Sequence, residues 1–246
     1  KVENCEPMSV DRFIPEHADF STYKLAAYGD CWTKLRIWQM NHLSRVIYLD
    51  ADMLLIRNMD ALFDLPSGFY AGADCYAGRL QRADRDRCPL FRTFDFTQGV
   101  EYFNAGLFVC EPGLGEFDKM CEIIRDVHQF QQFAGFYAEQ DFLNWYFKDS
   151  ICCLPYVFNA MKIMRTHHPG VWNLQEIFNI HYVDAKPWDK HHPSHGDFAD
   201  LNEIWWYVFE TRSLPETIAA PAAPSLPFQT FLQTLKSPSA SIQTRS

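Results

Sequence analysis

The sequence contains no apolar run that approaches the about 20 residues needed to cross a bilayer. It also lacks an excess of positive charge, because 22 Lys and Arg stand against 31 Asp and Glu for a formal net charge of −9. No block of basic residues reverses this balance locally, which argues against a nucleic-acid partner. We therefore expect a cytoplasmic protein with no transmembrane segment and no nucleic-acid ligand. No internal repeat is visible.

No pair of cysteines has the Cys-x-x-Cys spacing of a zinc or redox site. Several of the eight lie inside apolar stretches such as 108–110 and 151–154, where a free cysteine acts as a small hydrophobic residue. No signal peptide is visible, so we expect reduced core cysteines rather than disulfides. The cysteines are Cys5, Cys31, Cys75, Cys88, Cys110, Cys121, Cys152 and Cys153.

What the chain does have is apolar and aromatic material, since 48% of its 246 residues are hydrophobic and 16% are aromatic. This is enough to bury one large core. Beyond the aromatic segment 201–209, prolines recur among Ala, Ser and Thr, a composition typical of disorder. We expect one domain over residues 1–210 and a disordered tail over residues 211–246.

The most informative segment is 46–54, with the sequence VIYLDADML. Its apolar, β-branched start predicts a buried strand of a parallel sheet, whose open edge lies at the carboxyl ends of the strands. Residues two apart in a strand point to the same side, so Asp50 and Asp52 could share one divalent cation, which could neutralise a diphosphate. A helix cap or a solvated turn is the alternative interpretation.

The wider pattern alternates strands and helices, which predicts an α/β sheet covered on both faces. Segment 77–99 is charged and is predicted to be a solvated loop. The expected strands are 46–50, 69–73 and 106–110, and the expected helices are 31–43, 117–130 and 201–209.

Two other polar groups are His181 and the lysine of the Lys-Pro-Trp sequence at 186–188. His181 could complete a metal shell, and Lys186 could reach a phosphate oxygen through its flexible stem. Each residue alone would more often be a core or surface residue. The presence of Asp50 and Asp52 favours the interpretation that His181 and Lys186 belong to a metal and phosphate site.

Three further clusters carry polar groups at the edges of predicted elements. Asn104 and a glycine precede a strand and could contact sugar hydroxyls, although a turn would look the same. Residues 139–141, Glu-Gln-Asp, open a helical run, where acidic residues also favour a helix start. Lys34 and Arg36 lie on the first helix and face either the site or water.

The polar segments described above, taken in their order along the chain, resemble the motifs of glycosyltransferase family 8. Members of this family are retaining, metal-dependent sugar transferases and include glycogenin and galactinol synthases. The similarity covers about residues 1–210 and is carried by five motifs. Segments 103–112, 138–144 and 154–159 are most similar to galactinol synthase. The motifs are 34–36 (KLR), 48–52 (YLDAD), 102–106 (YFNAG), 139–144 (EQDFLN) and 181–188 (HYVDAKPW).

The resemblance implies an α/β GT-A fold, a Rossmann-like nucleotide-diphospho-sugar transferase with a mixed, mostly parallel sheet flanked by helices. It implies that Mn²⁺ is bound by Asp50, Asp52 and His181. Gln140 would lie at the β face of the anomeric carbon, next to the other candidate catalytic residues, Glu139 and Asp141. The implied substrate-binding residues are Lys34, Asp74, Asn104 and Lys186, with Lys186 on the diphosphate and the others, together with Glu139, along the donor sugar.

The implied donor is UDP-galactose or UDP-glucose, and the implied acceptor is a small polyol or saccharide such as myo-inositol. A homodimer is compatible with the sequence. The chain departs from the family pattern in two places. The family's first strand and helix are expected before Lys1, and only four residues, 182–185, separate His181 from Lys186, with Asp184 near the position of a family glycine.

Three other interpretations stay open. A phosphatase of the haloacid dehalogenase type also places Asp-x-Asp after an apolar strand, but it would leave Lys-Pro-Trp unexplained. A non-catalytic protein could keep the fold as a binding or scaffold subunit. A glycogenin-like protein would glucosylate one of its own tyrosines.

Overall fold

The computed structural model describes residues 5–74 and 102–219. The chain forms two compact units, one of Lys1–Val46 with Glu111–Phe147 and one of Ile47–Cys110 with Lys148–Ser246. The predicted loop 77–99, Cys75, Cys88 and most of the predicted tail lie outside the described residues, and the domain boundary at residue 210 stays a prediction.

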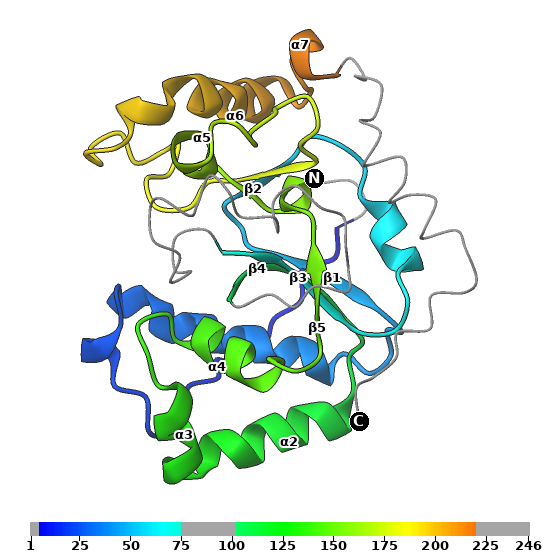
Figure 1. Ribbon diagram of the computed structural model, residues 1–246, viewed down its shortest axis with the longest axis vertical. Coiled ribbons are helices and arrows are strands. Elements are labelled where there is room, and N and C mark those ends of the chain that lie inside the picture. The colour runs from blue at the N-terminus through cyan, green and yellow to red at the C-terminus, as the bar shows by residue number, and fades with distance from the viewer. Residues whose placement is uncertain (1–4, 75–101, 220–246) are drawn as a thin grey trace. The chain divides into compact units, whose positions relative to one another are not determined.

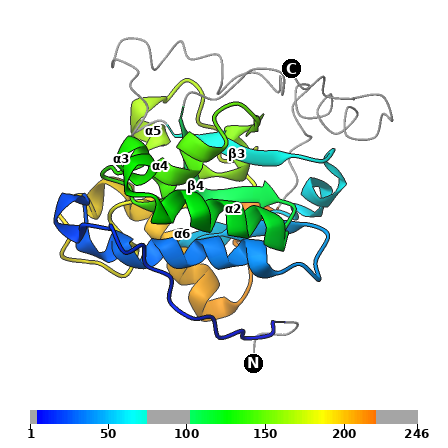
Figure 2. The ribbon, with the colours of Figure 1, turned by 90° about the horizontal axis from the view of Figure 1, so that it is seen from below.

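The first unit is mainly helical in its described part, and Figures 1 and 2 show η2 (Ala26–Gln39) in blue beside the green helices α2 (Leu114–Arg125) and α4 (Glu139–Tyr146). Trp32 and Trp38 are buried and supply much of its core. The Trp32 ring lies 5.9 Å from that of Phe130 and 5.8 Å from that of Phe142. The helices are η1 (Phe20–Thr22), η2 (Ala26–Gln39), α2 (Leu114–Arg125), α3 (Val127–Phe133) and α4 (Glu139–Tyr146).

The predicted helix 31–43 appears as η2, a 3₁₀ helix that starts and ends earlier. Trp32, Leu35 and Trp38 are all buried and stand three residues apart, which suits the three residues per turn of this helix type.

The prediction of one helix over residues 117–130 is wrong, because the chain forms two helices that meet at Asp126. The Asp126 carboxylate accepts from the backbone N–H groups of His128 at 2.8 Å and Gln129 at 3.2 Å. It therefore caps the start of α3, and its extended backbone interrupts the helical path.

The second unit holds two sheets. The larger sheet has the order β1 (Val46–Leu49), β4 (Phe103–Cys110), β3 (Phe69–Ala73), β5 (Ile151–Leu154), and its strands are labelled in Figure 1. The smaller has the order β2 (Met53–Leu55), β7 (Asn179–His181), β6 (Ala160–Met161). Strand β3 is parallel to β5 and antiparallel to β4, and β7 is parallel to β6 and antiparallel to β2.

This confirms the predicted α/β class with mixed sheets. The predicted strand 69–73 is β3, whereas the strand predicted at 106–110 begins three residues earlier, at Phe103, and is buried throughout. Apolar side chains such as Leu107, Ala160 and Ile180, all fully buried, form the core of this unit.

Short helices and one longer helix complete the second unit. Helix α6 contains the predicted segment 201–209, and its Leu201 joins the core. Trp205 packs on Tyr182 with ring centroids 5.3 Å apart, whereas Phe209 is exposed. The helices are η3 (Asp60–Asp64), η5 (Tyr156–Phe158), α5 (Met164–His167), η6 (Gly196–Phe198), α6 (Ala199–Thr211) and α7 (Glu216–Ala219).

Within the described ranges, no helix combines the length and the apolar character required to span a membrane. The six cysteines in these ranges are free; Cys5 is exposed, Cys31 is partly buried and the other four are buried.

Candidate functional site

The Asp-x-Asp segment is a turn at which the chain leaves one sheet and enters the other. Strand β1 ends at Leu49, and the Asp50 N–H then donates to the Gly106 carbonyl of β4 at 2.8 Å. Beyond the turn, Met53 of β2 pairs with His181 of β7. The expected strand alternation is therefore not what brings the two carboxylates together.

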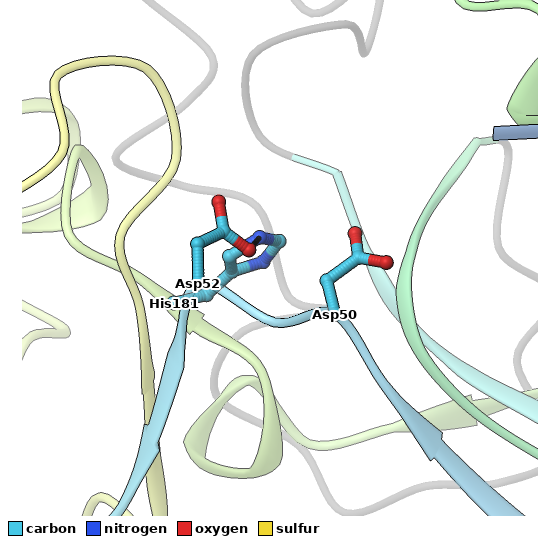
Figure 3. A group of neighbouring side chains, drawn as sticks. All are labelled: Asp50, Asp52 and His181. Atoms are coloured by element: carbon cyan, nitrogen blue, oxygen red, sulfur yellow. Dashed lines mark ion pairs between the residues drawn. The ribbon is translucent and has the colours of Figure 1, made fainter. Parts of the chain in front are cut away.

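The turn nevertheless gathers the three predicted metal ligands, as Figure 3 shows. Ligand atoms of Asp50, Asp52 and His181 all lie within 4.8 Å of one another. His181 Nε2 is 3.3 Å from Asp52 Oδ1, and the Tyr48 hydroxyl donates to Asp50 Oδ1 at 2.6 Å. His181 is buried while both carboxylates are partly exposed, so the cluster is open on its carboxylate side.

Gly106 leaves room for this arrangement. A Cβ at this position would overlap His181 Cε1 and lie 3.0 Å from Asp50 Oδ2. The Asn104 side chain also approaches this position, so only a glycine fits between the three side chains.

Lys186 lies on the cluster rather than in open solvent. Its ammonium donates to Asp52 Oδ2 and, at 3.0 Å, to the Tyr182 carbonyl. Burial raises the pKa of the Asp52 carboxyl, but hydrogen bonds and positive charge from His181 and Lys186 outweigh burial and hold this pKa well below its usual range. Asp52 is therefore a carboxylate at neutral pH.

A chain of hydrogen bonds extends from His181 to two predicted donor-sugar residues. His181 Nδ1 is 2.9 Å from Asn159 Oδ1, and Asn159 Nδ2 donates to Asn104 Oδ1 at 3.0 Å. Asn104 Nδ2 in turn donates to Asp74 Oδ2 at 3.2 Å. These residues are all buried, so the contacts form in a region of low dielectric, where such bonds are strong.

Asp184, which stands near the position of a family glycine, has a left-handed backbone with φ of 61°. Its carboxylate is half-exposed and lies 3.8 Å from His192 Nε2. It is not part of the three-residue cluster.

The remaining predicted residues belong to the first unit. Lys34 Nζ and Glu139 Oε1 form an ion pair at 2.8 Å, with each side chain only 5% exposed. Gln140 is buried in the first turn of α4. Asp141 Oδ2 accepts from the Tyr137 N–H at 2.9 Å, so this carboxylate stabilises the turn that leads into α4.

The predicted site residues thus fall into two groups, one in each unit. Within the second unit the structure connects Asp50, Asp52, His181 and Lys186 directly, and it links Asn104 and Asp74 to them through Asn159. Within the first unit it pairs Lys34 with Glu139 and places Gln140 and Asp141 on the same helix.

Sequence reasoning gave no role to Asn159 or Lys162. Lys162 is fully buried, its backbone N–H donates to the His181 carbonyl at 3.0 Å, and its ammonium donates to the Ala185 carbonyl. Burial, followed by the charge of Lys186, lowers the pKa of Lys162 to about 8. The available signal was a polar residue inside an apolar run, Asn159 after 156–158 and Lys162 within 160–164.

The residues of the cluster fit a divalent cation. Two carboxylates and one imidazole are donors that Mn²⁺ and similar ions accept. Gly106 keeps the space between Asp50 and His181 free of a side chain. The Lys186 ammonium forms an ion pair with the Asp52 carboxylate, and the His181 ring lies beside the same carboxylate.

An active-site mutant of LgtC has a similar fold, with a TM-score of 0.51 over 76% of this chain and 69% of that chain at 22% identity. The chain therefore has the GT-A fold. The family model described as glycosyl transferase family 8 matches residues 1–192, and the chain belongs to this family.

Two plant proteins are among its similar relatives. Galactinol synthase 2 of Arabidopsis thaliana is 33% identical over 231 residues, which cover 87% of this chain and 66% of the relative. Galactinol synthase 1 of Ajuga reptans is 31% identical over 260 residues, which cover 97% of this chain and 76% of the relative. The chain thus spans about two thirds of the Arabidopsis relative's length.

Proposed function

We propose that this chain is a retaining, metal-dependent glycosyltransferase that moves a hexose from UDP-galactose or UDP-glucose to a hydroxyl acceptor. The observation that carries the proposal is the cluster of Asp50, Asp52 and His181 in a member of glycosyl transferase family 8. The similarity to galactinol synthases favours myo-inositol as the acceptor. A cytoplasmic location and a homodimer remain predictions.

Asp50, Asp52 and His181 would hold the metal ion, proposed to be Mn²⁺. When bound, this ion supplies positive charge that stabilises the diphosphate leaving group. Lys186 adds a second positive charge, and its bond to the Tyr182 carbonyl orients the ammonium before the substrate arrives.

The proposed transfer needs no basic side chain, because the departing diphosphate accepts the proton of the acceptor hydroxyl. The bond between the anomeric carbon and the phosphate oxygen breaks, and its electron pair leaves with UDP. The acceptor oxygen then forms its bond on the same face, and its proton passes to the departing diphosphate. Retention of configuration follows from this geometry.

Other residues would bind the sugar. Asn104 and Asp74 are buried beside the cluster and offer amide and carboxylate groups to hydroxyls. In the first unit, Lys34 is the proposed donor contact, and the proposed catalytic residues are Glu139, Gln140 and Asp141. Before Lys34 or Glu139 could bind a hydroxyl with its charged group, each would have to share or exchange its present partner.

The test is UDP release from UDP-galactose and UDP-glucose, measured with Mn²⁺ or EDTA and with or without myo-inositol. We expect release that requires Mn²⁺ and rises with inositol. Asp52→Asn should lower the rate at least about 100-fold, because a metal ion contributes several kcal/mol to stabilisation of the transition state. Asp189→Asn, an exposed carboxylate in the same loop region, is the matched control and should keep the rate.

Folded protein that releases UDP equally well in EDTA would contradict the metal role. Intact mass after incubation with UDP-glucose separates transfer to inositol from self-glucosylation, because only the latter adds hexoses to the chain.

A further inference from the structure

We propose that Asn159 is a positioning residue that fixes the His181 imidazole with its proton on Nδ1 and its Nε2 directed at the Asp50 and Asp52 carboxylates. The inference rests on the proposed metal-binding role of this cluster. Asn159 touches neither carboxylate and acts through His181.

The four side chains Asp74, Asn104, Asn159 and His181 form a row of hydrogen bonds, and Asp74 determines which group donates in each bond. Asp74 presents a carboxylate oxygen, so the Asn104 group that faces it must be the amide NH₂. Asn104 Oδ1 therefore faces the other way. There it accepts from the Gly106 backbone N–H at 3.0 Å, a group that can only donate.

The same oxygen of Asn104 also meets Asn159 at 3.0 Å, so the atom that Asn159 presents must be its NH₂ donor. The other end of the Asn159 amide is then its oxygen, which lies 2.9 Å from His181 Nδ1. A carbonyl oxygen can only accept. His181 Nδ1 must consequently carry a proton, and in the neutral ring Nε2 has the free lone pair.

The His181 Nε2 atom lies on the side of the cluster, 3.3 Å from Asp52 Oδ1. The Nε2 lone pair and the Asp52 carboxylate oxygen are both electron-pair donors, so a divalent metal ion between them could bind both. A metal-ligating histidine usually donates its other N–H to an acceptor of this kind, which orients the ring and raises its basicity.

Burial makes the chain of bonds a fixed framework. Asn159 and His181 are each 3% exposed, so water has little access to replace the amide. Gly106 participates twice, because its N–H orients Asn104 and its missing side chain leaves room for the His181 ring. Gly106 of β4 thus determines both the donor–acceptor direction of these hydrogen bonds and the position of the imidazole.

The first experiment compares Mn²⁺ affinity in the absence of any sugar nucleotide, by calorimetry on the full chain. Asn159→Ala removes the acceptor and should weaken binding about 10-fold to 100-fold. Asn159→Asp keeps an acceptor for His181 but loses the donor to Asn104. It should bind Mn²⁺ much more tightly than the alanine variant even where it is less stable.

Asn179→Ala is the matched control, because Asn179 is also fully buried in the second unit and donates to the Phe158 carbonyl at 3.2 Å. It should lower stability and leave Mn²⁺ affinity nearly unchanged. Equal affinities in wild type and a folded Asn159→Ala would overturn the inference, as would an aspartate variant no better than alanine.

A second readout needs neither metal nor activity. Nitrogen-15 NMR of the metal-free protein, at a pH that leaves the ring neutral, should show the His181 proton on Nδ1 in wild type and in Asn159→Asp, and loss of this preference in Asn159→Ala. A wild-type ring protonated on Nε2 would overturn the inference whatever the metal data. Absence of Mn²⁺ binding with an Nδ1 proton would instead contradict only the proposed metal dependence.

Discussion

Asp184 occupies a left-handed backbone conformation, with φ of 61°, that residues with a side chain adopt at a cost of about 1 to 2 kcal/mol. Asp184→Gly should therefore raise the free energy of unfolding by about 0.5 to 1 kcal/mol, since the added freedom of the unfolded glycine offsets part of the gain. Urea denaturation would measure this. Asp189→Gly is the control in the same loop region, where φ is not positive, and should be neutral or destabilising. A less stable Asp184→Gly would mean that the contact with His192 matters more than the backbone.

Single residues were predictable where their chemistry is unusual and not where it depends on neighbours. Asp50, Asp52 and His181 were predicted as one metal site, and the structure brings them together, although through a turn between sheets rather than through strand alternation. Asn159 could not be given a role, because its function arises only from hydrogen-bond partners far away in the sequence.

The helical elements of the first unit are joined by a buried ion pair, between Lys34 of η2 and Glu139 of α4. Glu139→Gln would leave the Lys34 ammonium buried without its 2.8 Å partner, which typically costs about 3 to 5 kcal/mol. We expect a loss of this size in the free energy of unfolding, measured by urea denaturation.

Glu122→Gln on the exposed face of α2 is the matched control for this loss and should change stability little. A loss below about 1 kcal/mol for Glu139→Gln would indicate that Lys34 finds another partner or reaches water.

Elements were predicted well where the apolar pattern dominates. Strand β3 appears over its predicted residues because its run is buried almost throughout. The prediction of one helix across Asp126 was wrong because the apolar spacing continues on both sides of this residue. The Asp126 side chain nevertheless caps a new helix, so the first helix ends there. The Asp126 carboxylate bonds backbone N–H groups that a continuous helix would bond through its own carbonyls. The spacing of apolar residues gives no information about this local competition.

For the molecule as a whole, buried tyrosines make stability fall at high pH. Burial is the main cause that raises the pKa of Tyr156 to about 12, with the nearby Glu176 carboxylate adding to it and the Asn173 N–H opposing it. Between pH 10 and 12 the unfolded chain gives up this proton while the folded chain keeps it, so stability is lost as pH rises. Burial also raises the pKa values of Tyr146 and Tyr182.

Tyr156→Phe removes one of these groups. The variant should be less stable at neutral pH by about 1 kcal/mol, because the hydroxyl no longer bonds the Val171 carbonyl. Its stability should fall by about 1 kcal/mol less than that of wild type between pH 9 and pH 11. Urea denaturation across this range would measure the difference, and parallel curves for the two proteins would contradict the assignment.

The contact between Lys186 and Asp52 means that the candidate metal site already contains a cation of its own. A divalent ion entering the cluster would exchange places with an ammonium that is covalently tethered and therefore always present. Because the Lys186 ammonium is part of the protein, it competes with metal ions under all conditions. The measured metal affinity would therefore always include the free energy needed to displace this ammonium from Asp52. The same tether would leave the displaced ammonium next to the new ion, where an anionic diphosphate could bind both charges at once.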